Sequence, residues 1–77
     1  MNSQRRKSIR EALNLIDKAR SILEDAANDE SESVSNLPEN LQDSEKAEQM
    51  ETNVYIIEEY ASSLEDTEEI ESMMETA

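Results

Sequence analysis

Two apolar stripes with helical spacing, separated by a single proline, constrain this chain more than any other feature. In the first half, apolar residues recur mostly at steps of three, four or seven, which places them on one side of an α-helix. This first stripe consists of Ile9, Leu13, Ile16, Leu23, Ala27 and Val34. The second stripe alternates steps of three and four through Ala47, Met50, Val54, Ile57, Ala61 and Leu64. The stripes therefore predict two amphipathic helices.

The break between the helices falls at Pro38, the only proline in a chain that has no glycine. Proline lacks an N–H, and its ring keeps the preceding Leu37 out of helical geometry. We therefore expect one domain spanning residues 1–77. It would comprise a first helix over about 4–34, a linker over about 35–43 and a second helix over about 44–75.

The helix ends near this linker are less sharply defined. The first helix could end anywhere between Ala27 and Val34, because the intervening segment is polar and low in complexity. Pro38 suits the first position of a short helical turn. Asp43 or Ser44 then offers a side-chain oxygen to cap the second helix.

Charge is distributed very unevenly along the chain. Residues 1–20 contain six Lys/Arg and two Asp/Glu, whereas the remainder contains only Lys46 against eighteen Asp/Glu. Folding about residue 39 sets the basic cluster Arg5, Arg6, Lys7 and Arg10 beside Glu65, Glu68, Glu69 and Glu71, and sets Lys18 and Arg20 near Glu58 and Glu59. The same alignment pairs Ile9 with Ile70, Ile16 with Ala61, and Leu23 with Val54. Because both patterns favour one register, the sequence predicts an all-α antiparallel two-helix hairpin.

Further apolar residues beside the stripes predict self-association. They are Leu15, Ile22, Ile56 and Tyr60, accompanied by Ala12, Ala19 and Ala26 at intervals of seven. Ordering a residue costs about 1.5 kcal/mol, and a lone hairpin buries little to offset that cost. We therefore expect a homodimer that forms a four-helix bundle. Arg20 falls on the first stripe, and we expect its stem to pack while its guanidinium reaches solvent or an acid.

The composition removes most catalytic chemistries. Without His, Cys or Gly there is no metal-bound imidazole, thiolate nucleophile or glycine-rich phosphate loop. We assign no catalytic, cofactor-binding or metal-binding residue, and the function favoured is non-enzymatic protein–protein binding. One enzymatic alternative is a small Mg²⁺-dependent all-α nucleotide pyrophosphatase. Its candidate carboxylates are the Glu-x-x-Glu pairs Glu45 and Glu48, Glu48 and Glu51, Glu65 and Glu68, and Glu68 and Glu71.

The charge also limits the partners. A net charge of −13 opposes binding to nucleic acid, despite the basic cluster near the start. It equally allows an acidic decoy that mimics nucleic acid and captures a basic protein. The longest apolar run, residues 54–57, is far shorter than the roughly 20 residues that span a bilayer. We therefore expect a cytoplasmic protein, a protein partner of unknown identity, and no membrane contact.

The linker and the start of the second helix, Asn-Leu-Pro-Glu-Asn-Leu-Gln-Asp-Ser-Glu-Lys-Ala-Glu-Gln-Met over residues 36–50, carry a resemblance. This segment, between a helix with a basic start and an acidic helix, resembles small uncharacterised proteins of Gram-positive bacteria and their phages. The resemblance implies a helical hairpin in a bacterial or phage setting. It implies no activity, cofactor or site residue.

Overall fold

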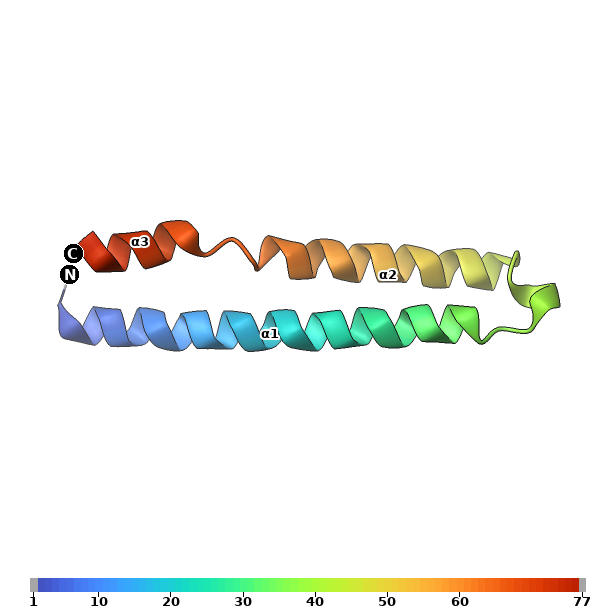
Figure 1. Ribbon diagram of the computed structural model, residues 1–77, viewed down its shortest axis with the longest axis horizontal. Helices are drawn as coiled ribbons and strands as arrows, with labels where there is room; N and C mark the ends of the chain where they lie inside the picture. Colours follow the sequence, from blue (N-terminus) through green and yellow to red (C-terminus); the bar gives the residue numbers. More distant parts are fainter. Residues whose placement is uncertain (1, 77) are drawn as a thin grey trace.

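The computed structural model describes residues 2–76 as a helical hairpin about 60 Å long. Its elements are α1 (Ser3–Ser35), the short 3₁₀ helix η1 (Glu39–Leu41), α2 (Glu45–Ser63) and α3 (Glu68–Thr76). No strand occurs within this range. Helices α2 and α3 follow one another back along α1, so that α3 lies beside the start of α1 (Figure 1). The predicted all-α hairpin is confirmed.

Local capping explains where α1 begins and ends. The side-chain oxygen of Asn2 accepts the N–H of Arg5 at 2.8 Å, which satisfies one of the free donors of the first turn. At the other end, the N–H of Asn36 donates to the carbonyl of Glu32 at 3.0 Å, two residues before the proline. Helix α1 thus continues through the polar segment 28–35 and ends at Ser35, one residue beyond the later of the two predicted limits.

The linker also follows the predicted chemistry. Pro38 is the N-cap of η1 rather than its first residue, and its carbonyl accepts the N–H of Leu41 at 2.8 Å. Ser44 caps α2, because its hydroxyl oxygen accepts the N–H of Ala47 at 3.2 Å. The side-chain amide of Gln42 donates to the carbonyl of Leu37 at 3.2 Å and ties the linker together. Of the two predicted capping residues, Ser44 is the one that caps the helix.

The prediction of one continuous second helix over 44–75 is wrong, because the chain leaves helical geometry between α2 and α3. The N–H groups of Leu64 and Glu65 donate to carbonyls three residues back, the tightened pattern that closes many helices. The break shifts the helical phase, so that Thr67 and Met74 are half-buried while Glu68 is exposed. An unbroken seven-residue repeat would instead have turned Glu68 toward α1.

The predicted register is also displaced. The amide of Asn53 donates to the carboxylate of Glu30 at 3.1 Å, which fixes the alignment of α1 against α2. Folding about residue 39 would have placed Glu30 near Glu48 instead. The difference arises because η1 and the turn after it lengthen the connection on the α2 side.

The interior between the helices is small. Among the residues that the structure describes, only Ala27, Ala47 and Ala61 are buried, each with 3% or less of its surface exposed. The larger stripe residues are half-buried: Ile9, Leu13, Ile16, Leu23, Val34, Met50, Val54, Ile57 and Leu64. The two predicted stripes therefore do face one another, but a single copy of the chain leaves them partly open to water.

Candidate interaction surfaces

Arg20 occupies the first stripe and satisfies its charge within its own helix. Its Nη2 lies 2.8 Å from the Asp17 carboxylate, and its Nη1 lies 2.9 Å from that of Glu24. Hydrogen bonds to Asp17 and then to Glu24 raise the pKa of the guanidinium above its ordinary value. Its side chain is 28% exposed, so the stem packs while the head reaches two acids, as the sequence predicts.

The predicted charge pairing between the two arms is only partly present: α3 does lie beside the start of α1 (Figure 1), but no ion pair joins the arms within the described residues. Both ion pairs found in the part of the chain that the structure describes lie within α1. Arg20 therefore meets Asp17 and Glu24 rather than Glu58 or Glu59. Long, exposed charged side chains gain little from holding one geometry in water, so local pairs one turn apart are as favourable as pairs across the hairpin.

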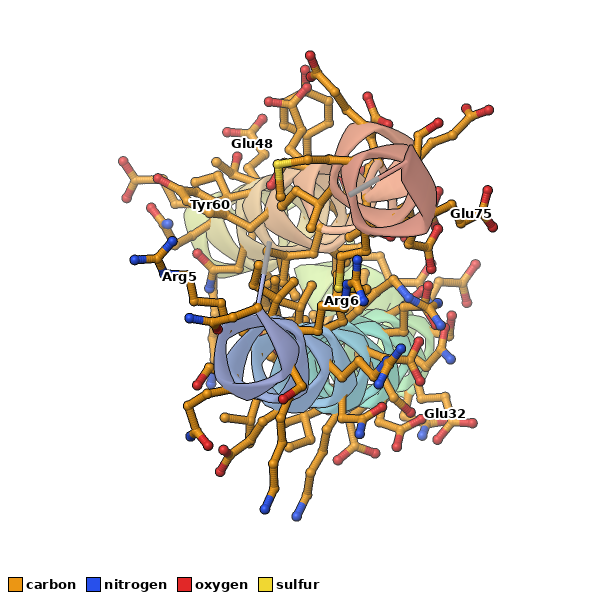
Figure 2. The ribbon with its side chains drawn as sticks, turned by 90° about the vertical axis from the view of Figure 1, so that its left-hand side faces the viewer. Arg5, Arg6, Glu32, Glu48, Tyr60 and Glu75 are labelled. Atoms are coloured by element: carbon orange, nitrogen blue, oxygen red, sulfur yellow. The ribbon has the colours of Figure 1, made fainter. Side chains whose placement is uncertain are left out.

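Leu15, Ile22, Ile56 and Tyr60 form what we call the apolar face. These residues are 60%, 58%, 47% and 67% exposed, respectively. Tyr60 and Arg5 project to the same side of the hairpin, with Glu32 and Glu75 on the other side (Figure 2).

Helical spacing places the other members of the apolar face on that side. Ala12, Ala19 and Ala26 continue the seven-residue repeat from Arg5, and Leu15 and Ile22 lie one turn after the first two alanines. Ile56 lies one turn before Tyr60. Both arms of the hairpin thus contribute to one apolar surface.

The opposite side, which we call the acidic face, carries Asp17, Glu24, Glu51, Glu58 and Glu65. Asp17, Glu24 and Glu58 each follow a residue of the apolar face by two positions, about 200° around a helix. Glu51 and Glu58 line one shallow cavity with Ser31, and Asp17 lines another with Glu65. The carboxylates of the two arms therefore gather on one side of the hairpin.

Tyr55 also lies toward the acidic face, in the cavity that contains Glu51 and Glu58. Its hydroxyl donates to the Glu59 carboxylate at 3.0 Å. This hydrogen bond, followed by the negative charge of Glu59, raises the pKa of the Tyr55 phenol above 10.0. The second tyrosine of the chain, Tyr60, lies on the apolar face, so the two aromatic residues lie on different surfaces.

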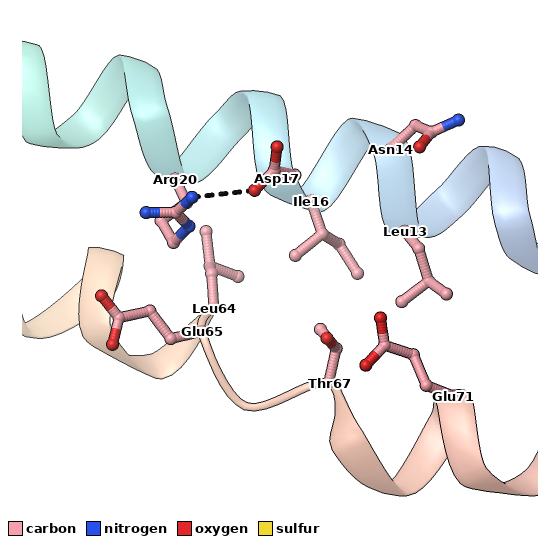
Figure 3. Close-up of a pocket in the computed structure, with 9 residues that line it drawn as sticks. All are labelled: Leu13, Asn14, Ile16, Asp17, Arg20, Leu64, Glu65, Thr67 and Glu71. Atoms are coloured by element: carbon pink, nitrogen blue, oxygen red, sulfur yellow. Dashed lines mark hydrogen bonds and ion pairs between the residues drawn. The ribbon is translucent and has the colours of Figure 1, made fainter.

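The break between α2 and α3 opens a cavity of about 440 Å³ against α1. Leu13, Ile16 and Leu64 supply its apolar part (Figure 3). Carboxylates of Asp17, Glu65 and Glu71, the hydroxyl of Thr67 and the Arg20 guanidinium surround these side chains. The cavity is open to solvent and offers apolar contact with acidic edges.

This cavity is the surface feature that sequence reasoning missed. The sequence did indicate the break that forms it. Asp66 and Thr67 are followed directly by Glu68 and Glu69, an arrangement typical of the start of a new helix. The same break separates Glu65 from Glu68, so their Glu-x-x-Glu spacing is not the helical pair that a continuous helix implied. Within the described residues, no group of three or more acidic side chains is placed to hold a metal ion.

None of the helices, over the described range, has the length and apolarity that crossing a membrane requires.

Comparison of the chain with protein-family models, with curated proteins and with solved structures gave no match. The resemblance of residues 36–50 to small proteins of Gram-positive bacteria and phages therefore stays a prediction. The class that the geometry itself defines is a small, acidic helical hairpin with one apolar and one acidic face.

Proposed function

We propose that this chain is a non-enzymatic interaction protein that pairs with a second copy of itself to form a four-helix bundle. The observation that carries the proposal is that the buried residues of the hairpin are small, whereas several of its large apolar residues are exposed. The only buried residues in the described part of the chain are three alanines, while Leu15, Ile22 and Tyr60 each keep more than half of their surface exposed.

The physical argument concerns the free energy of folding. Burial of apolar surface is the main favourable contribution, at about 25 cal/mol per Å², and conformational entropy opposes it. Two helices in contact along one half-buried stripe remove little apolar surface from water. A second hairpin placed against the apolar face covers its residues and encloses the edges of the two stripes, which is how four-helix bundles obtain their core.

The acidic face remains uncovered in such a dimer and gives it a surface for a further partner. Its carboxylates, together with the net charge of −13, favour a protein with a basic surface. Long-range attraction of this kind weakens at high salt. A partner that uses this face is therefore expected to bind less tightly as the salt concentration rises. The cytoplasm is the location proposed for this assembly.

Sedimentation equilibrium tests the self-association directly. We expect a mass near twice the 8.8 kDa of the chain at micromolar concentration, and a parallel loss of helical circular dichroism as the dimer dissociates on dilution. A fully helical monomer at every concentration from about 1 to 100 µM would overturn the proposal.

A further inference from the structure

We infer that the two copies pack head to tail through their apolar faces, with α1 antiparallel to α1 of the second copy about a two-fold axis near Ala19. This inference rests on the proposed self-association and adds its geometry. It follows from three independent features: the distribution of charge along the hairpin, the residues on each arm of the apolar face, and the charges at the ends of α1.

The distribution of charge separates the hairpin into two unequal halves. Because the two arms run antiparallel, the contact between Glu30 and Asn53 places residue 24 close to the level of residue 60. The loop half, residues 24–60, contains twelve Asp/Glu and one Lys, a net charge of −11. The terminal half, residues 2–23 with 61–76, contains eight Asp/Glu and six Lys/Arg, a net charge of −2.

Only one arrangement of two hairpins avoids placing the strongly charged halves together. If both copies point the same way, the two loop halves lie against each other, and a net charge of −11 faces a net charge of −11. If they point in opposite ways, each loop half lies on a terminal half, so −11 faces −2. Coulomb repulsion grows with the product of the charges, and residues within about 8–10 Å of one another are little screened at physiological salt. Charge therefore favours the head-to-tail arrangement.

The arm that contributes most of the apolar face is α1. Its stripe is uninterrupted by polar residues and is exposed except at the half-buried Ala19: Ala12, Leu15, Ala19, Ile22 and Ala26. On α2, Asn53 and Gln49 interrupt the corresponding stripe, and the Asn53 amide is held by Glu30 and Gln49. The α1 stripe alternates small and large side chains and is centred on Ala19, so it matches itself when a second copy runs in the opposite direction.

The ends of α1 carry charges that oppose its own dipole. Arg5, Arg6 and Lys7 lie near the positive N-terminal end, and Glu30 and Glu32 lie near the negative C-terminal end. Both placements are unfavourable for an isolated helix. Arg5 projects to the side of the apolar face (Figure 2), and an antiparallel α1 centred at Ala19 brings it within one helical turn of the level of Glu30 of the second copy, so the two ends lie near compensating charge.

Disulfide cross-linking tests the arrangement, because the chain has no cysteine. A disulfide requires Cα atoms within about 7 Å, which only residues near the two-fold axis satisfy with their own copies. Under mild oxidation we expect Ala19→Cys to form covalent dimers at least tenfold faster than Ser21→Cys, the matched control, which lies about 200° away around α1. A mixture of Ala12→Cys and Ala26→Cys proteins should form the mixed dimer in preference to either self-linked one.

Two further measurements separate the possible failures. Sedimentation of each reduced variant reports whether the dimer itself forms, and a monomeric mass would overturn the proposed self-association. A dimer in which Ala26→Cys links to Tyr60→Cys, and Ala19→Cys does not self-link, would instead establish the same-direction arrangement. A dimer that cross-links at none of these positions would overturn the head-to-tail arrangement while leaving self-association standing.

Discussion

The apolar face and the acidic face lie on the same two arms, yet they differ in how favourably they interact with water. The apolar face exposes large side chains that water does not favour, whereas the acidic face exposes carboxylates that water solvates well. The difference arises from a displacement of two residues along each helix, since Leu15 precedes Asp17 and Ile56 precedes Glu58. The comparison indicates that one face is built for burial and the other for solvent or a charged partner.

The largest expected effect comes from placing a charge on the apolar face. Ile22→Glu removes an apolar side chain and introduces a carboxylate in each copy, at about 1.5 kcal/mol or more per copy. We expect the dimer dissociation constant, measured by sedimentation, to rise about 100-fold.

The matched control places the same charge on the acidic side of the same helix. Ser31→Glu should change the dissociation constant less than about threefold, because Ser31 lies beside Glu51 and Glu58, away from the apolar face. Equal effects of Ile22→Glu and Ser31→Glu would show that net charge, rather than the apolar face, controls association.

A smaller effect is expected from the interior that lies between the two faces. Leu23 is half-buried on the inner stripe, so Leu23→Ala should lower the free energy of unfolding by about 2 kcal/mol, the low end of the range for leucine truncation. Urea denaturation followed by circular dichroism measures this change. Leu15→Ala, on the apolar face, should lower the midpoint only at concentrations where the protein is dimeric. If the urea midpoint depended on protein concentration in the same way for both variants, the division between interior and apolar face would be contradicted.

The contact that sets the register between the arms should contribute less to the free energy of unfolding than Leu23 does. Asn53→Ala removes the amide that donates to Glu30, and we expect a loss of about 1 kcal/mol in the free energy of unfolding. Gln49→Ala is the control, because it removes only the bond between Gln49 and Asn53 on α2. A larger loss from Gln49→Ala than from Asn53→Ala would argue against this register.

The smallest expected effect concerns Tyr55 on the acidic face. In a Tyr60→Phe background, absorbance titration should show Tyr55 ionising above pH 10.0, because its hydroxyl donates to the Glu59 carboxylate. Glu59→Gln should move the pKa back toward 10.0. Since the folded-state pKa is raised, the stability from this contact is present below pH 10.0 and is lost as the pH rises through the folded-state pKa. No change on Glu59→Gln would show that the contact is absent in solution.

The helical pattern was accessible from the sequence because it is local. Steps of three and four between Ala47 and Leu64 admit no other regular structure, and Pro38 can only interrupt a helix that approaches it. Ser44 was a predictable cap for the same reason, since capping involves atoms a few residues apart. The flanking residues Leu15, Ile22, Ile56 and Tyr60 were likewise recognisable as apolar surface beyond the inner stripes.

The break at residues 64–67 was missed although Asp66 and Thr67 carried a local signal, and the true register had no local signal. Each depends on how a whole arm fits against the other, and small differences in phase or linker length decide between alternatives of similar local energy. The predicted ion pairs across the hairpin failed for a related reason. For a charged side chain in water, several ion pairs have nearly equal free energy, and Arg20 forms its pairs with Asp17 and Glu24 on its own helix.

Sequence alone determined that this protein is two amphipathic helical arms joined at Pro38, because periodicity, capping and proline geometry act over short distances. Tertiary structure alone decided that Glu30 meets Asn53 and that a cavity opens beside Leu64. It also showed that three alanines make up the buried interior of the described chain. These features depend on the packing of residues far apart in sequence, which no local pattern specifies.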